Sequence, residues 1–245
     1  MLMSSNELQR CSGAFWANVS LPDKKNRDEN NNQNCDNKTE VTDESIVISG
    51  CSDYETEIDF SGPYLLTINE KTMGAVSTFE LFQPAFNSYM GVKASSASAL
   101  RNDGWYNQAS IWENLNGKWK WRVKATGEYK IVFEKLPLTT APATAPVTYN
   151  SAGQTVLGPV HLNGSTTFSI SCPDAKLAGF TAELFDAETG DEILEDYANI
   201  LGVVNWENNQ QINNYSKDVT VELPEKNYLI KVSSNFAANW TVSIN

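Results

Sequence analysis

The chain has 245 residues, a length that suits one or two domains, and its formal net charge is −12 at pH 7. Nucleic acid and anionic membrane surfaces are bound by clusters of basic residues, so this charge disfavours both as partners. The sequence has no run of about 18 apolar residues, and we therefore expect no membrane insertion. A surface of this sign suits the binding of a cation or of a neutral partner such as glycan.

Residues 1–43 form a region of their own. They are polar and rich in asparagine, which predicts a flexible N-terminal arm rather than a packed domain. The exception is the run GAFWANVSL at 13–21, whose composition is typical of a strand. We expect this run to pair with an open sheet edge, in its own molecule or in a neighbouring copy.

Residues 44–138 alternate apolar and polar side chains at period two, which is typical of strands with one buried face. Short strands at regular spacing favour a β-sandwich, and we assign 44–138 to a first sandwich domain. The strands predicted in it are 45–49, 55–60, 63–69, 76–83, 109–114, 118–124 and 128–134.

The run KWKWRVKATGEYKIVFE at 118–134 predicts a hairpin with Trp119 and Trp121 on one face. These rings either fill the core or form a platform for a ligand. The run KDVTVELPEKNYLIKV at 217–232 repeats the alternation and has Val219 at the position aligned with Trp119. A core tolerates such an exchange better than a ring-stacking site does, so we interpret the tryptophans as core.

The Thr/Ala/Pro-rich stretch in 139–153 predicts a short extended linker, because proline also biases the residue before it away from helix. We assign the remaining residues, 154–245, to a second β-sandwich domain. The strands predicted in it are 154–162, 165–171, 178–186, 200–206, 217–223, 226–233 and 238–244.

Two further blocks repeat at nearly the same offset. IDFSGPYLLTI at 58–68 aligns with VHLNGSTTFSI at 160–170, and TFELF at 78–82 aligns with TAELF at 181–185. A repeat of about 100 residues has the size of a domain and not of a solenoid unit. The sequence therefore predicts an all-β fold of two tandem antiparallel β-sandwiches that arose by internal duplication.

The chain closes with two strand-like runs, YLIKV and NWTVSI, whose alternating residues include Tyr228, Ile230 and Trp240. This pattern resembles the closing hairpin of secreted prokaryotic β-sandwich modules, including the pre-peptidase C-terminal-like domains. The resemblance covers the second predicted domain best. It implies an accessory, non-catalytic domain outside the cell.

The loop NDGWYNQ at 102–108 combines two rings, Trp105 and Tyr106, with the polar side chains of Asn102 and Asp103. Aromatic rings stack on pyranose faces while amides and carboxylates bond sugar hydroxyls, so this mixture suits a glycan site. The alternative is that Trp105 packs against the edge of the sandwich.

The turn DAETGDE at 186–192 places Asp186, Glu188, Asp191 and Glu192 around a glycine. Hard oxygen ligands at such spacing suit Ca²⁺, although the full EF-hand loop pattern is absent. The alternative is a solvated acidic turn without a metal. We expect no other cofactor.

Four cysteines allow three pairings. One reading joins Cys11 to Cys35 within the arm and Cys51 to Cys172 between the two domains. The alternative is four unconnected thiols.

Five Asn-x-Ser/Thr sequons fit an extracellular or cell-surface glycoprotein. They begin at Asn18, Asn37, Asn163, Asn214 and Asn239.

The only histidine, His161, lies in a predicted strand, and no G-x-S-x-G motif accompanies it. We therefore expect no enzyme and nominate no catalytic residue. The leading hypothesis is an extracellular β-sandwich protein for binding or surface attachment (adhesion), with glycan as its partner. The alternative is a structural subunit of a surface layer or filament, self-associating by strand donation from the N-terminal arm.

Overall fold

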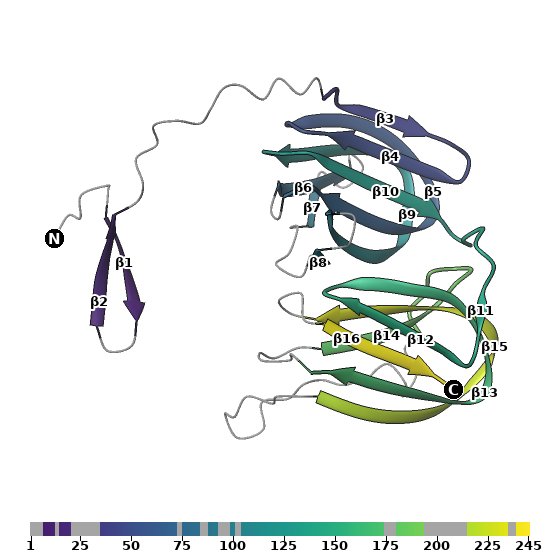
Figure 1. Cartoon of the computed structure of the whole chain (residues 1–245). Coiled ribbons are helices and arrows are strands. Elements are labelled where there is room, and N and C mark those ends of the chain that lie inside the picture. The colour runs from purple at the N-terminus through teal and green to yellow at the C-terminus, as the bar shows by residue number, and fades with distance from the viewer. Residues whose placement is uncertain are drawn as a thin grey trace. The chain divides into compact units, whose positions relative to one another are not determined.

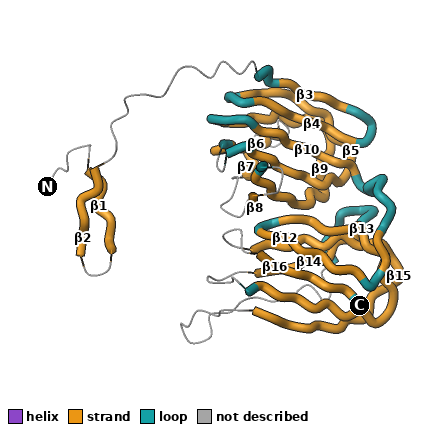
Figure 2. Tube along the Cα trace, viewed as in Figure 1, coloured by secondary structure: helices purple, strands orange, loops and turns teal. Residues whose placement is uncertain are grey.

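The computed structural model of the chain describes residues 7–12, 15–20, 35–72, 75–83, 88–92, 99–100, 104–173, 180–193, 215–234 and 239–245. The regular elements in these ranges are all β-strands, as the alternation predicts (Figure 2). The chain divides into two compact units, Met1–Asn34 and Cys35–Asn245. The prediction of an all-β, antiparallel fold is confirmed.

The first unit contains a hairpin within the predicted arm. Strand β1 (Glu7–Ser12) pairs antiparallel with β2 (Phe15–Ser20), and Cys11 lies opposite Trp16. Residues 15–20 of the strand-like run thus form β2, which pairs with a strand of the same arm.

The first sheet of the second unit has eight strands, seven of which lie in the order β3-β4-β10-β5-β9-β6-β7 (Figure 1). The eighth strand, β8, pairs with β9. Their bounds are β3 Lys38–Val41, β4 Ser45–Gly50, β5 Tyr54–Glu70, β6 Val76–Gln83, β7 Ser88–Val92, β8 Ala99–Leu100, β9 Tyr106–Ala125 and β10 Tyr129–Lys135.

This sheet folds over on itself because β5 and β9 are long and bend together. Their register shifts between Gly62 and Tyr64, and Gly62 has a φ of 127°, which an L-residue with a side chain rarely adopts. The buried residues Phe60 and Leu66, on either side of the bend, belong to one core cluster. One continuous sheet therefore supplies both layers of a sandwich.

The second sheet has the order β12-β16-β13-β15-β14, and a short parallel strand, β11, pairs with β13. It bends in the same way, with a register shift between Leu162 and Gly164 in β13. The bounds are β11 Ala143–Thr144, β12 Val147–Ala152, β13 Thr155–Cys172, β14 Phe180–Asp186, β15 Tyr215–Ser234 and β16 Asn239–Ile244. The predicted linker 139–153 thus includes β12, which belongs to the second sheet.

The two sheets share a strand order when β4, β10, β5, β9 and β6 are matched with β12, β16, β13, β15 and β14. The aligned blocks at 58–68 and 160–170 fall on the matched strands β5 and β13. Internal duplication stays a prediction, because the agreement is one of topology.

The strand pairing shows that the sequence alignment of 118–134 with 217–232 is wrong. Trp119 lies opposite Ile58, whereas Tyr228 lies opposite Val160, the residue aligned with Ile58. Trp119 therefore corresponds to Tyr228 and not to Val219.

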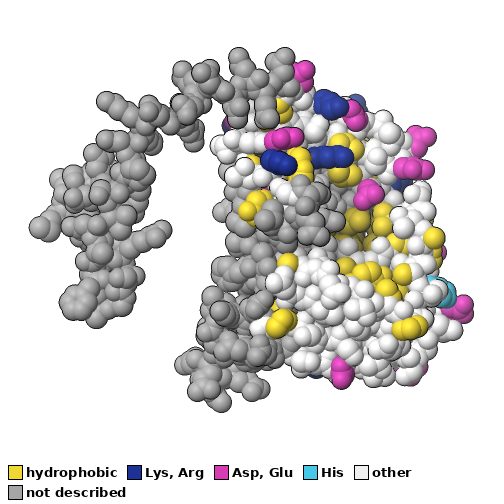
Figure 3. Space-filling view, viewed as in Figure 1, with side chains coloured by type: hydrophobic (Ala, Val, Ile, Leu, Met, Phe, Trp, Pro, Cys, Tyr) yellow, Lys and Arg dark blue, Asp and Glu magenta, His cyan; other side chains and the backbone are white. Residues whose placement is uncertain are grey.

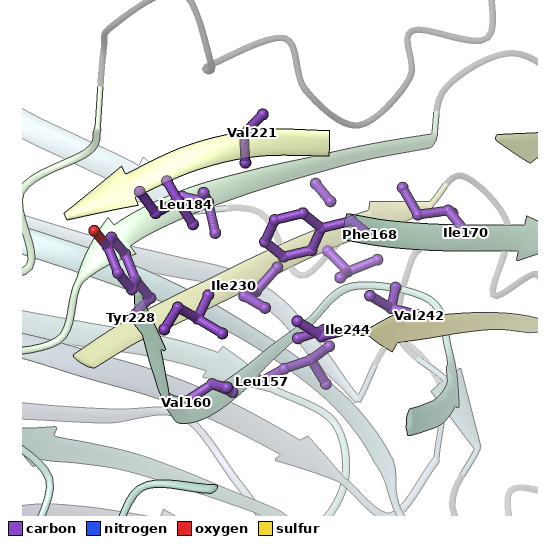
Figure 4. Close-up of a cluster of buried hydrophobic side chains, with 14 of the residues drawn as sticks. Leu157, Val160, Phe168, Ile170, Leu184, Val221, Tyr228, Ile230, Val242 and Ile244 are labelled. Carbon is purple, nitrogen blue, oxygen red and sulfur yellow. The ribbon is translucent and has the colours of Figure 1, made fainter. Parts of the chain in front are cut away.

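Each sandwich encloses its own core. In the first, Trp121 is fully buried and Trp119 is 4% exposed, which confirms that the Trp-rich face is core and not a ligand platform. In the second, Phe168, Ile230 and Val242 meet between the two layers (Figure 4). The two cores are separate clusters, so each sheet could bury its apolar face alone.

A third apolar cluster joins the two sheets. It contains Leu65 of β5 and Leu136, which directly follows β10, together with Phe185 and Leu229 of the second sheet. Gly190 lies at this junction with a φ of +73°, where an added Cβ would stand 3.0 Å from Pro63 Cβ. The turn after β14 thus packs directly against the first sheet.

Gly190→Ala should lower the free energy of unfolding by about 1–3 kcal/mol, since it adds left-handed strain and crowding at the junction. Gly117→Ala is the control, because Gly117 has a φ of +80° with nothing within 4 Å of an added Cβ. Urea unfolding of both variants measures the difference. Equal losses in the two variants would mean that the turn does not press on the first sheet.

Candidate ligand-binding site

The candidate site lies where β5 ends and β9 begins. Glu70, the last residue of β5, lies opposite Tyr106, the first of β9. Lys71 follows, and its Nζ stands 5.1 Å from the centroid of the half-buried Trp105 ring. This register places a cation over an aromatic face at the end of the first sheet.

Two amides lie next to this pair, the half-buried Asn69 and the buried Asn107, which is 8% exposed. Asn107 Nδ2 donates to Asn69 Oδ1 at 2.8 Å, and Asn69 Nδ2 donates to the carbonyl of Lys130 at 3.1 Å. These bonds hold both side chains in fixed orientations beside the Trp105–Lys71 pair.

A buried carboxylate, that of Glu70, fixes the backbone next to the site. Glu70 is 1% exposed, and its Oε1 accepts a hydrogen bond from the amide of Val76 at 3.2 Å. The amide of Lys71 donates to the carbonyl of Glu128 at 2.9 Å. The chain on either side of Lys71 is therefore anchored, which fixes where its ammonium can reach.

Sequence reasoning found only part of this site. Trp105 and Tyr106 lie in it, while Asn102 and Asp103 fall outside the described residues. Lys71 and Asn69 were missed, because their closeness to Trp105 follows from the β5–β9 register and no local motif encodes it.

The acidic turn predicted as a calcium site has a structural role. Asp186 Oδ1 accepts hydrogen bonds from the amides of Glu188 and Thr189 at 2.8 and 3.3 Å, and Oδ2 accepts one from Lys226 Nζ at 2.9 Å. Glu188 and Asp191 are exposed. Within the described ranges, no three His, Cys, Asp or Glu side chains gather as metal ligands.

Burial raises the pKa of Asp186, but the Lys226 ammonium and the two amides outweigh it and hold that pKa below its usual value. A lowered pKa stabilises the fold above the ordinary pKa of Asp, near 3.9, and this contribution disappears as the pH falls through the lowered value.

Asp186→Asn should therefore cost about 1 kcal/mol at pH 7, since the amide still accepts from the turn but loses the charged bond to Lys226. Thermal melts across pH 2–7 measure this loss. The gap between the two proteins should close at the acid end. A gap that stays constant with pH would show that the Asp186 charge does not contribute.

The predicted disulfide pairings are wrong. Cys35 is bonded to Cys51, with their Cα atoms 6.0 Å apart, and Cys172 is buried in the second core without a disulfide bond. The bond closes the base of the β3–β4 hairpin, because Lys38 pairs with Ser49 just inside it. Strand pairing, which the cysteine spacing did not show, selects this partner.

The sequons fall in different settings. Asn37 is a poor site for glycosylation, because its Nδ2, the atom that would carry the glycan, donates hydrogen bonds to Ser52 Oγ at 2.8 Å and to the carbonyl of Asp53 at 3.1 Å. Asn163 and Asn239 are exposed, Asn18 lies in β2, and Asn214 is outside the described residues.

His161 lies near the bend of β13. Its Nδ1 is 3.1 Å from Asn227 Oδ1, and its Nε2 is 3.8 Å from Glu225 Oε1. An exposed ring between an amide and a surface carboxylate fits the strand position predicted for it.

One finding bears on location. A disulfide is typical of proteins that fold in an oxidising compartment. In the part of the chain that the structure describes, no helix has the length and hydropathy needed to cross a membrane.

No protein-family model and no curated protein matches the sequence. Two solved structures show distant similarity. One is a beta-porphyranase of glycoside hydrolase family 86 from the human gut bacterium Bacteroides plebeius, with 8% identity and a TM-score of 0.19 over 88% of this chain and 37% of that one. The other is an isomalto-dextranase of Arthrobacter globiformis T6 in complex with panose, with 12% identity and a TM-score of 0.22 over 82% and 34%.

This chain spans about a third of the length of either protein. Scores this low carry no argument about function. The site must therefore be judged on its own residues.

Proposed function

We propose that this chain is an extracellular, non-enzymatic protein that binds glycan, and that the site at Trp105 takes part in attachment to a surface. The observation that carries the proposal is the half-buried Trp105 ring with the Lys71 ammonium 5.1 Å from its centroid, beside the amide of Asn69, which the buried Asn107 holds in place. The disulfide supports an extracellular location.

The chemistry of these groups suits a sugar. An aromatic ring offers an apolar face to the C–H groups of a pyranose, while ammonium and amide groups bond its hydroxyls. Glycoside hydrolysis generally uses a pair of carboxylates that flank the bond to be cleaved. The groups of this site are a ring, an ammonium and amides, so the role we propose is binding alone.

Trp105→Ala should reduce glycan binding at least about tenfold, because ring stacking and the cation–π contact with Lys71 are lost together. A glycan array followed by titration calorimetry on the best ligand measures this. Trp112→Ala is the matched control, since Trp112 is also a half-buried tryptophan but lies within β9, opposite Tyr64 at the bend. Loss of binding in both variants, or in neither, would contradict a site at Trp105.

A further inference from the structure

On β12, β16 and the second half of β13, the second sheet presents an outer face of uncharged side chains, most of which carry hydroxyl groups. Along β13 the buried residues Phe168 and Ile170 alternate with side chains on the other side of the strand, and β12 and β16 follow the same rule. We call this the hydroxyl face, formed by Thr148, Thr167, Ser169, Ser171, Thr241 and Ser243.

The face is regular. The registers of β12 with β16, and of β16 with β13, run without a shift, so Thr148, Ser243 and Ser169 form one row across three strands. Asn150, Thr241 and Ser171 form the next row. Adjacent strands lie about 4.8 Å apart and alternate residues about 6.8 Å, which sets the hydroxyls on a nearly flat grid.

Neighbouring side chains on the grid hold one another. Thr148 Oγ1 lies 2.9 Å from Ser243 Oγ, and Thr241 Oγ1 donates to Asn150 Oδ1 at 2.8 Å. Thr167 Oγ1 lies 2.8 Å from the hydroxyl of Thr220 on β15. These bonds restrict the rotamers, so less side-chain entropy remains to be lost on binding.

Charge sets this face apart from the rest of the molecule. One residue in five of the chain is charged, yet the outward side chains of β12, β16 and the second half of β13 are all uncharged. Asp218 and Glu222 stand only on β15, at the margin. In Figure 3, the surface over β12 and β16 is correspondingly almost all white.

The occupant must match this chemistry. A protein partner is disfavoured, because the face is roughly 14 by 20 Å, well below the area of a stable interface, and it carries no aromatic or aliphatic anchor. A charged polymer finds no opposite charge. An uncharged polysaccharide matches, because each hydroxyl and amide can both donate to and accept from sugar hydroxyls.

We propose that the hydroxyl face binds an uncharged polysaccharide displayed as an insoluble surface. Each contact is weak, so binding relies on many hydroxyls meeting an ordered array at once. This second surface does not involve Trp105, and the two proposals can therefore fail separately.

The test is depletion of the protein from solution by cellulose powder, chitin powder and starch granules. Wild type should be depleted by at least one of the three solids. Ser243→Glu should weaken that depletion at least about tenfold. Binding to the solid would bury the new carboxylate, and the hydrogen bond between residue 243 and Thr148 would be lost. Thr241→Val, which removes a hydroxyl without adding charge, should weaken it as well.

Two controls complete the test. Ser49→Glu adds the same charge on β4 of the first sheet, between Lys38 and Lys130 in register, and should leave depletion unchanged. Trp105→Ala should also leave it unchanged. The proposal is overturned if none of the solids depletes the wild type, or if folded Ser243→Glu and Thr241→Val are depleted as the wild type is.

Discussion

Trp121→Ala should lower the free energy of unfolding by about 3–5 kcal/mol, the largest effect that we expect from a single side chain. Trp121 is fully buried and its ring centroid lies 4.9 Å from that of Phe133 and 6.4 Å from that of Phe60. A domain of this size has about 5–15 kcal/mol in total, so the variant should be close to unfolding at 37 °C.

Urea unfolding followed by far-UV circular dichroism measures this loss. Trp105→Ala is the matched control. Loss of the half-buried Trp105 ring should lower the free energy of unfolding by less than about 1 kcal/mol, while the variant no longer binds its ligand. If the two variants lost equal stability, the assignment of one tryptophan to the core and the other to a site would be wrong.

Replacing Cys35 and Cys51 together by serine should cost about 3 kcal/mol, the second large effect. The bond spans 16 residues, and the loop entropy that it removes from the unfolded chain is of this size. The loss should concentrate on β3, because that strand buries almost nothing: Lys38, Glu40 and Val41 are exposed.

Hydrogen exchange of the peptide covering 35–50 measures the local effect. The amides of β3 should exchange faster in the double variant, while those of the second sheet stay protected. Cys172→Ala is the control, since Cys172 forms no disulfide and lies in the second core, so its effect should appear in the second sheet and not in β3. Unchanged exchange at 38–41 in the double variant would disprove the role of the bond.

Much of the fold could be predicted from residue alternation. The predicted strand 76–83 coincides with β6, and 45–49 falls within β4. Four pairs of predicted strands are instead four long strands. Glycines such as Gly62 and Gly164, which look like turn signals, supply the positive φ at or beside a register shift where a continuous strand bends.

Edge strands were harder to predict for a different reason. Strand β3 has three exposed residues of four, so it lacks the alternation that marks a buried face. Strand β12 follows a proline-rich stretch and reads as part of a linker. Such strands are defined by a backbone ladder to a neighbour, and the neighbour is distant in sequence.

The site was predictable only where composition was unusual. Trp105 and Tyr106 stand out among amides, but Lys71 reaches the ring through strand pairing. Asp186 looked like a metal ligand because its neighbours are acidic. Its oxygens accept hydrogen bonds from Lys226 and from backbone amides of the turn, and the partner Lys226 lies 40 residues away in sequence.

The shared strand order of the two sheets has a consequence for biogenesis. During folding, a central strand of one sheet could pair with the matching strands of the other sheet, because both sheets have the same strand order. Exchange of strands between the two sheets is therefore a route to misfolding. The two cores differ in side-chain volume, however. Trp121 of β9 lies opposite Thr56 of β5, while on the matched strands Ile230 of β15 lies opposite Leu157 of β13. A hybrid sheet would be overpacked in one half and hollow in the other, which selects against the swapped product during folding.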